Sequence, residues 1–333
     1  MRDIVQVKGC KGRDFLTKPV KLSQNLYLID DFDLSQPERT GTYVLTEEKL
    51  TIIETSASPS IPYLLQGLKD LYLSPEDIQY IIVTHIHLDH AGGAGLLLQS
   101  CPNATVVVHP KGARHLSDPS RLIAGAQAVY GEKFNELFDP ILPIPSERLL
   151  IKNDKDSLTI GPECTLNFYD SPGHANHHFS IHHPNSNGMF TGDTVGVFYP
   201  QLYRDGIELY LPSTSPNQFD PDKMRESMLK FENMNLTRIY FGHYGMSNSP
   251  TEVYKQVRLW LNIFMDTAVQ SYQDHTNFDE RVKSLSKGLF LNLSDHLTAK
   301  GGASDHPSFQ MIALDLDVCS MGMIDYLDRK AKK

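Results

Sequence analysis

The segment over residues 81–93 constrains this chain more than any other stretch. An apolar, largely β-branched run over residues 81–84 predicts a buried strand, and small residues followed by three leucines at 96–98 predict a turn into a helix. Four side chains that can bind a metal lie between them, namely His85, His87, Asp89 and His90. Imidazole nitrogens and carboxylate oxygens suit Zn²⁺, iron and Mn²⁺. The segment therefore predicts a metal site at the end of a rigid strand.

The spacing within this segment indicates two metal ions. His85 and His87 are two residues apart and could share one ion, whereas the adjacent Asp89 and His90 would point elsewhere and could hold a second. Two ions need further ligands from other parts of the chain.

Three remote residues supply these ligands in the same local pattern, an apolar strand followed by a glycine and then the ligand. His174 follows a Ser-Pro-Gly turn, Asp193 follows Gly192, and His243 follows Gly242. A carboxylate can give one oxygen to each of two metals, so Asp193 is the candidate bridging ligand. His177 and His178 lie beside His174 and are assigned supporting roles.

Strand and helix patterns predict an α/β fold with two β-rich halves. Residues 25–30, 41–45 and 50–54 predict an antiparallel meander, and residues 148–151, 157–160, 164–169, 178–183 and 189–191 predict a second block of strands. Helices are expected between and beyond them, so the prediction is a four-layer αββα sandwich with a C-terminal helical extension. The expected divisions are an N-terminal arm at 1–24, the sandwich at 25–249, and helices at 250–333 that pack on it.

Composition narrows the classes of function. The net charge of −9 over 333 residues disfavours a nucleic-acid partner, and no apolar run reaches the length of a membrane span. The start of the chain lacks the apolar segment of a signal peptide, so a cytoplasmic location is expected. Four scattered cysteines with no Cys-x-x-Cys pair predict buried thiols rather than a disulfide framework or a structural zinc.

The four motifs together resemble a known family. The order T-H-x-H-x-D-H, S-P-G-H, G-D-T and F-G-H is similar to that of the metallo-β-lactamase fold superfamily, in particular its glyoxalase II-like metallohydrolase branch, over about residues 20–250. The resemblance implies that His85, His87 and His174 hold one metal, that Asp89, His90 and His243 hold the other, and that Asp193 bridges them. Zinc β-lactamases of the commonest type carry a cysteine where this chain has Asp193, so β-lactam hydrolysis is not expected.

A dinuclear hydrolase is the function expected from these residues. Two divalent ions, zinc first with iron or manganese as alternatives, would lower the pKa of a bridging water, and the resulting hydroxide would attack a small ester, thioester or lactone. Asp89 could relay a proton to the leaving group. The aromatic segment at 194–219 is the expected pocket wall, and the candidate substrate residues are His109, Phe198, Tyr199, Tyr210 and Tyr244.

Other interpretations of the same motifs stay open. The first alternative is a persulfide dioxygenase with a single iron, followed by a nuclease of the same superfamily and a non-catalytic binding protein. The expected partner is a small molecule, with neither nucleic acid nor membrane. The helical tail could cover the sandwich or form the contact of a homodimer.

Overall fold

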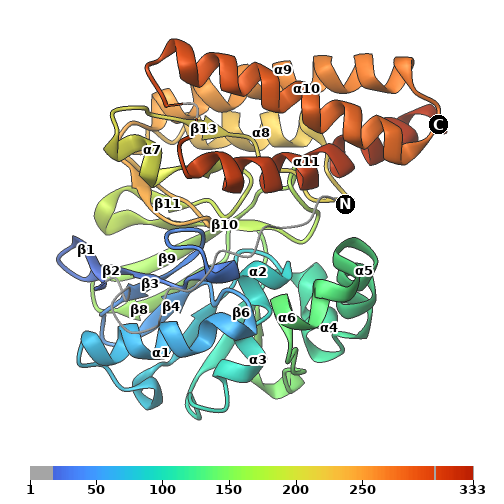
Figure 1. The fold of residues 1–333 in the computed structure, drawn as a ribbon. Helices are drawn as coiled ribbons and strands as arrows, with labels where there is room; N and C mark the ends of the chain where they lie inside the picture. Colours follow the sequence, from blue (N-terminus) through green and yellow to red (C-terminus); the bar gives the residue numbers. More distant parts are fainter. Residues whose placement is uncertain (1–17, 304, 333) are drawn as a thin grey trace.

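Two facing β-sheets with helices on their outer sides form the structure, a computed structural model that describes residues 18–303 and 305–332 (Figure 1). The first sheet has the strand order β1 to β7 and the second has the order β15-β14-β11-β10-β9-β8. A separate pair, β12 and β13, forms a third, two-stranded sheet. This arrangement is the predicted αββα sandwich.

The first sheet begins as an antiparallel meander and continues as a parallel sheet. Its strands are β1 (Val20–Ser23), β2 (Leu26–Asp30), β3 (Gly41–Leu45), β4 (Thr51–Ile53), β5 (Tyr80–Ile82), β6 (Thr105–Val108) and β7 (Leu149–Ile151). Strands β1 to β4 pair antiparallel, which confirms the predicted meander, and β4 to β7 pair parallel. Parallel pairing places the carboxyl ends of β4 to β6 at one edge of the sheet.

Two sequence-based boundaries need correction. The N-terminal arm predicted over residues 1–24 contains a strand, because residues 20–23 form β1 and pair with β2; residues 1–17 of that arm lie outside the described residues. The strand predicted at 148–151 belongs to the first sheet rather than to the second block, since β7 is the last strand of that sheet. The helices between β6 and β7 return the chain to the same edge, which makes this pairing parallel.

The second sheet carries the later ligand-bearing strands. Its members are β8 (Ser157–Gly161), β9 (Cys164–Asp170), β10 (Phe179–His183), β11 (Gly188–Phe190), β14 (Arg238–Tyr240) and β15 (Met246–Ser247), while β12 (Val197–Phe198) and β13 (Tyr210–Leu211) form the small pair. The inner faces of the two large sheets meet in an apolar core. Within it, Tyr43 packs edge-on against Phe190 and Tyr240, with ring centroids 5.0 and 5.7 Å apart.

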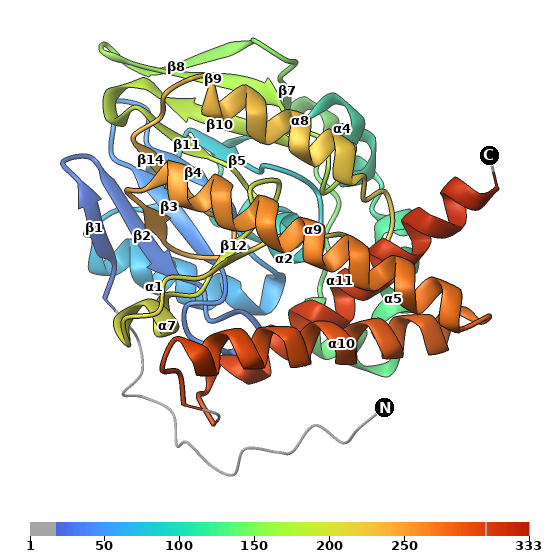
Figure 2. The ribbon, with the colours of Figure 1, turned by 90° about the horizontal axis from the view of Figure 1, so that it is seen from above.

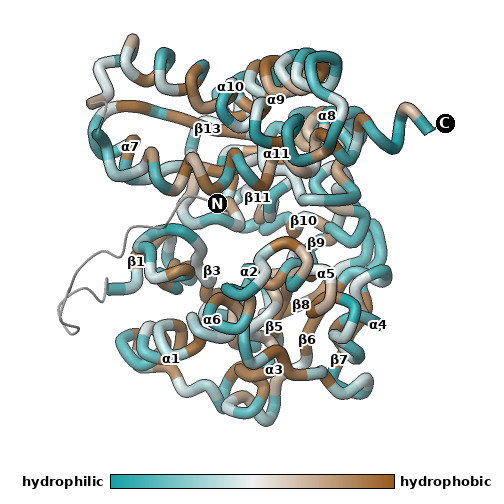
Figure 3. Tube along the Cα trace, turned by 45° about the vertical axis from the view of Figure 1, so that its right-hand side comes forward, coloured by the Kyte–Doolittle hydropathy of each residue, from teal (hydrophilic) through white to brown (hydrophobic). Residues whose placement is uncertain are grey.

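Helices cover the outer side of each sheet. The helices of the first half are α1 (Ile61–Asp70), α2 (Leu88–Ala91), α3 (Ala94–Leu97), α4 (Pro110–Ser117), α5 (Ser120–Tyr130) and α6 (Phe134–Phe138). Leu64 and Leu68, one helical turn apart on α1, are fully buried against the first sheet. Figure 3 shows the apolar stretch around α3 in brown at this outer layer.

The second half ends in three long helices. Its helices are α7 (Pro200–Arg204), α8 (Pro221–Glu232), α9 (Pro250–Asp274), α10 (Phe278–Ala299) and α11 (Ser308–Ala331). Helices α9 and α10 run side by side (Figure 2), and four leucines of α10 at a spacing of four residues are buried in the core that α9 shares: Leu285, Leu289, Leu293 and Leu297. The predicted C-terminal helical region is therefore present, and none of the described helices is long and apolar enough to span a membrane.

Candidate metal centre

The structure brings all seven predicted ligand residues to one edge of the sandwich. His85 and His87 follow β5, Asp89 and His90 lie on the short helix α2, and His174 lies on the turn after β9. Asp193 and His243 follow β11 and β14 directly. These strands end at the same edge of the sandwich. Residues as far apart in the chain as His85 and His243 therefore meet there.

Six of the seven residues form two groups of potential metal ligands. In the first group, ligand atoms of His85, His87 and His174 lie within 4.8 Å of one another. In the second, ligand atoms of Asp89, His90 and His243 do the same. The two groups have the membership that the resemblance to the metallo-β-lactamase superfamily implied.

The carboxylate of Asp193 lies between these groups. Its Oδ1 is 3.3 Å from Nε2 of His90, and its Oδ2 is 3.3 Å from Nε2 of His243 and 3.6 Å from Nε2 of His174. Ser213 donates a hydrogen bond to Oδ2 at 3.0 Å and fixes the plane of the carboxylate. The carboxylate of Asp193 is therefore close to ligand atoms of both groups, to His90 and His243 of the second and to His174 of the first.

The hydrogen bonds around His85 leave a free lone pair for a metal. Thr84 donates its hydroxyl proton to Glu54, so its oxygen can accept the Nδ1 proton of His85, 3.0 Å away. The Nε2 of His85 then carries the lone pair, and it is buried without a hydrogen-bond partner among the described residues. Burying polar atoms unpaired is costly, so a bound cation would satisfy this nitrogen.

The remaining donors fit a cation for the same reason. Both ring nitrogens of His90 and Oδ1 of Asp193 are buried and make no hydrogen bond to any part of the chain that the structure covers. Nδ1 of His87 and Nε2 of His174 point at each other at 2.9 Å, with Nδ1 of His174 turned to the carbonyl of Ser213 at 3.1 Å. Converging nitrogens with oriented outer atoms are typical of metal-binding histidines.

Glu54, which the sequence argument missed, lies beneath the histidines. It is buried at the end of β4, and its Oε1 is 3.5 Å from Nδ1 of His90 and accepts the hydrogen bond from Thr84. Glu54 therefore orients His90 directly and His85 through Thr84. Its position at a strand end beside the other ligands was the available sequence signal.

The charges of His85, His87, His174 and Asp193 suit a cation. Burial, together with His90 and His87, holds the pKa of His85 well below its usual value, and burial also lowers the pKa of His87 and His174. These three imidazoles are neutral ligands. Burial alone would raise the pKa of Asp193, but His243, His90 and His174 outweigh it and hold that pKa well below its usual value, so Asp193 is an anion.

His177 and His178 lie next to the ligand groups. The backbone amide of Asp193 donates to Nε2 of His178 at 3.2 Å, and Nδ1 of His178 is 2.8 Å from the hydroxyl of Ser171. His178 thus supports the loop that carries Asp193. The ring of His177 lies 5.1 Å from that of His87, and burial lowers the pKa of His177 to about 3.

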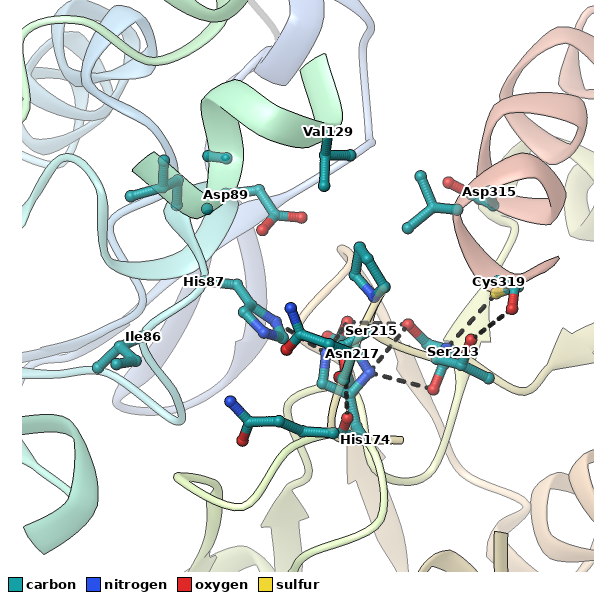
Figure 4. A pocket seen from close by; sticks show the side chains of 18 of the residues that line it. Ile86, His87, Asp89, Val129, His174, Ser213, Ser215, Asn217, Asp315 and Cys319 are labelled. Carbon is teal, nitrogen blue, oxygen red and sulfur yellow. Dashed lines mark hydrogen bonds and ion pairs between the residues drawn. The ribbon is translucent and has the colours of Figure 1, made fainter. Parts of the chain in front are cut away.

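A cavity of about 330 Å³ opens over the centre (Figure 4). His87, Asp89, His174, Asp193 and His243 line its base. One wall is apolar and comes from α5, with Leu122, Ala126, Val129 and Tyr130. Figure 4 shows Asp315 and Cys319 of α11 across the cavity from Asp89, and the loop with Ser213 and Ser215 lies between.

Only one of the five predicted substrate residues lines this cavity. Tyr199 does, but Phe198, Tyr210, Tyr244 and His109 are not among its lining residues in the described chain. The rings of Phe198 and Tyr210 stack on Phe241 in the core, with centroids 5.8 and 5.6 Å away. The pairing of β12 with β13 turns these two aromatics inward.

The other two misplaced residues have structural contacts. His109 accepts a hydrogen bond from the backbone amide of Lys111 at 3.1 Å and so caps α4, while its Nε2 lies 3.2 Å from Asp170. Tyr244 is buried in the core between the sheets. Both were predicted from closeness in sequence to ligands, which does not fix the direction of a side chain.

A buried ion-pair network forms the wall that sequence reasoning missed. Arg39 donates from Nε to Asp33 at 3.0 Å and from a terminal nitrogen to Asp315 at 3.1 Å, and Tyr199 donates to the other oxygen of Asp315 at 2.9 Å. The hydroxyl of Tyr199 is therefore engaged and does not point free into the cavity. No local pattern in the sequence could join Arg39 to a helix at the far end of the chain.

Comparison with known proteins agrees with the fold. The chain is 25% identical over 214 residues to ST1585 of Sulfurisphaera tokodaii, described as a metallo-beta-lactamase fold-containing protein, with 63% of this chain and 74% of that protein covered. The crystal structure of TTHA1429 from Thermus thermophilus, a metallo-beta-lactamase family protein, superposes with a TM-score of 0.63 at 18% identity, over 93% of this chain and 95% of that one.

A flavoprotein is also among the relatives. Diflavin flavoprotein A 1 of Synechocystis is 27% identical over 178 residues, but this match covers 51% of this chain and 26% of the flavoprotein.

The family model of the metallo-beta-lactamase superfamily matches residues 38–243, a range that contains all seven candidate ligands. The chain therefore belongs to the metallo-β-lactamase superfamily.

Proposed function

We propose that this protein is a dinuclear metal-dependent hydrolase that cleaves a small ester, thioester or lactone. The position of Asp193 carries the proposal, because its carboxylate lies 3.3 Å from Nε2 of His90 and of His243 in one ligand group and 3.6 Å from Nε2 of His174 in the other. Zinc is the proposed metal, with iron and manganese as the alternatives that the same imidazole and carboxylate donors accept. His85, His87 and His174 would hold one ion, and Asp89, His90 and His243 the other.

When bound, two such ions activate water as a nucleophile near neutral pH and polarise the carbonyl of the substrate. Proton transfer to the leaving group is the role proposed for a side chain of the protein. Asp89 is the proposed proton relay, because its side chain is 26% exposed at the base of the cavity and its Oδ2 is 3.7 Å from Nε2 of His243. Its accessible oxygen can pass a proton to a leaving group that sits in the cavity.

The walls of the cavity favour a substrate with an apolar acyl part and no net charge. Leu122, Ala126 and Val129 of α5 give one apolar side, and Val318 of α11 adds to the other. Asp33 and Asp315 neutralise Arg39, so its guanidinium is not free to bind an anion. The only other guanidinium that lines the described cavity is that of Arg121, which argues against a nucleic-acid substrate.

Redox chemistry at iron is the second candidate. The relationship to a diflavin flavoprotein supports it, and so does the completeness of the His85, His87 and His174 group, which could hold a single iron as in a persulfide dioxygenase. Oxygen consumption with a persulfide, measured on iron-loaded protein, would favour this candidate over hydrolysis.

A metal count combined with a substrate panel tests the proposal. Untagged protein is expected to hold about two equivalents of metal, which the Asp193→Ala variant should lose. The unsubstituted protein should hydrolyse aryl esters, thioesters or lactones. The exposed Asp266→Ala is a matched control and should keep both properties. Unchanged metal content and unchanged hydrolysis in the Asp193 variant would contradict the assignment.

A further inference from the structure

A second group of potential metal ligands lies at the opposite end of the sandwich. Ligand atoms of Glu47, Cys164 and His183 lie within 4.8 Å of one another. Glu47 belongs to the turn between β3 and β4, Cys164 is the first residue of β9, and His183 is the last residue of β10. The metal centre follows the other end of β9, so the length of this strand separates the two places by roughly 20 Å.

The strand faces direct these side chains toward each other. Cys164, Leu166 and Phe168 on β9 alternate inward, as do Phe179 and Ile181 on β10, and all five pack in the core between the sheets. His183 continues the β10 series by two positions and is buried on the same face. Glu47 reaches this place from the first sheet.

Contacts of the turn hold Glu47 against the second sheet. The backbone amide of Lys49 donates to the carbonyl of Ile160 at 2.8 Å, which ties the turn to β8. A Cβ atom on Gly161 would lie 2.9 Å from Oε2 of Glu47, so the carboxylate rests directly on the turn between β8 and β9. Asn25 donates to Oε1 at 3.2 Å and leaves Oε2 for another partner.

The ring of His183 is set for a metal by its neighbour. The hydroxyl of Ser186 donates to the carbonyl of His183 at 3.3 Å, so its oxygen can accept the Nδ1 proton of His183 at 2.8 Å. This tautomer places the lone pair on Nε2. His183 is 5% exposed, and its Nε2 is buried with no hydrogen-bond partner in residues 18–303 and 305–332.

We propose that Glu47, Cys164 and His183 form a second zinc site, which links the two sheets. One thiolate, one imidazole and one carboxylate are all ligands that Zn²⁺ accepts, and water can complete a tetrahedron. Binding would replace the S–H bond of Cys164 by an S–Zn bond and release the proton to solvent. Zinc bonds of about 2.0 to 2.3 Å require the three donors, whose ligand atoms lie within 4.8 Å of one another, to draw closer on binding.

The protonation states of Cys164 and His183 are compatible with metal binding. Burial and the carboxylate of Glu47 raise the pKa of the Cys164 thiol to about 11, so this thiol keeps its proton until a cation arrives. Burial lowers the pKa of His183 to about 4, so its ring is neutral at pH 7. The absence of a Cys-x-x-Cys pair in the sequence hid this group, because its members come from three distant segments.

Cobalt(II) titration distinguishes this site from the metal centre. Thiolate ligands give Co²⁺ an intense near-ultraviolet charge-transfer band that imidazole and carboxylate ligands do not give, and the metal centre has only the latter. A variant with Cys10→Ser, Cys101→Ser and Cys319→Ser keeps Cys164 as the sole cysteine of the chain. This variant should show the band with Co²⁺ alone, and Asp193→Ala added to it should not remove the band.

Two further substitutions complete the test. Cys164→Ser in the otherwise unchanged chain should abolish the band, and His183→Gln should weaken Co²⁺ binding at least about tenfold. Zn²⁺ should raise the Tm of the Asp193→Ala variant but not that of the Asp193→Ala, Cys164→Ser variant. No band in the variant that keeps only Cys164 would overturn the proposal, as would a band that survives Cys164→Ser. The first of these results does not depend on the folding of any Cys164 variant.

Discussion

Asp315 of α11 accepts a hydrogen bond at 3.1 Å from the guanidinium of Arg39, a residue 276 positions earlier in the chain. The same carboxylate accepts the hydroxyl proton of Tyr199, and all three residues line the cavity over the metal centre. The C-terminal helix is thus part of the cavity wall, and this ion pair joins it to Arg39. This relationship explains why the sandwich alone does not complete the cavity.

Loss of the charge on Asp315 should therefore weaken substrate binding more than chemistry. In Asp315→Asn, we expect KM for the best substrate to rise about fivefold with kcat nearly unchanged, because the metal centre stays intact while the wall loosens. Stability should fall by about 1 to 3 kcal/mol through the weaker charge-assisted hydrogen bonds. Steady-state kinetics and thermal unfolding check both effects. Asp266→Asn, an exposed change on α9, is the control, and equal behaviour of the two variants would refute the role of Asp315.

Glu54 should control the affinity of the centre for metal. Glu54→Gln removes the negative charge 3.5 Å from Nδ1 of His90 and disturbs the bond from Thr84 that orients His85. Outer residues of this kind typically contribute about 10- to 100-fold in metal affinity, so we expect a loss of this size. Competition with a chromophoric chelator measures it. The exposed Glu226→Gln should keep wild-type affinity, and an unchanged affinity in Glu54→Gln would contradict the assigned role.

The apolar wall of α5 should set the length of the acyl group. In Ala126→Phe, the larger ring fills part of a cavity of about 330 Å³, so long-chain aryl esters should lose at least about tenfold in kcat/KM. Acetyl esters should be affected little. Ala128→Phe on the exposed side of the same helix is the matched control. A uniform loss for all chain lengths would show that the acyl group does not lie along α5.

Asp31 should make the stability depend on pH. Asp31 is fully buried, Thr42 donates to its Oδ2 at 2.9 Å, and its Oδ1 has no partner in the described chain. Burial raises the pKa of Asp31 well above its usual value, so the folded chain keeps a proton that the unfolded chain releases near its ordinary pKa of about 3.9. The folded state therefore loses stability as pH rises from about 4 toward the raised pKa.

Asp31→Asn tests this pH dependence. The amide stays neutral at every pH. The free energy of unfolding of the variant, relative to that of the wild type, should therefore rise by about 1 kcal/mol or more from about pH 4 to about pH 8. Urea unfolding at both pH values measures the difference. The control is the exposed Asp266→Asn, for which the gap to the wild type should not change with pH. If the difference in the free energy of unfolding between Asp31→Asn and the wild type also stays constant with pH, Asp31 is ionised in the folded chain.

The ligand groups were predictable because each ligand follows a strand directly. An apolar run, a glycine and then His174, Asp193 or His243 is a local pattern, and the strands of the sandwich bring such ends to one edge. Glu54 shares this position at the end of β4 and could have been found by the same argument. The two-sheet architecture also followed from strand patterns.

The cavity walls were not predictable in this way. Phe198 and Tyr210 were chosen for their place after Asp193, but strands of two residues give too short a pattern to show which face is inward. The Arg39 and Asp315 pair depends on how a helix docks after three long segments have folded. Strand β7 was misassigned because the sequence does not show with which earlier strand it pairs.

Anomalous diffraction at the zinc edge, from crystals of the Cys164→Ser variant grown with Zn²⁺, tests the dinuclear centre most directly. A centre of two metals should give two peaks about 3.5 to 4 Å apart, with the carboxylate of Asp193 between them and three further protein ligands at each. The Cys164→Ser substitution removes the second proposed zinc site. The peaks therefore test the dinuclear centre alone, whether or not the second site binds zinc. A single peak at His85, His87 and His174, or no peak beside Asp193, would contradict a centre of two metals.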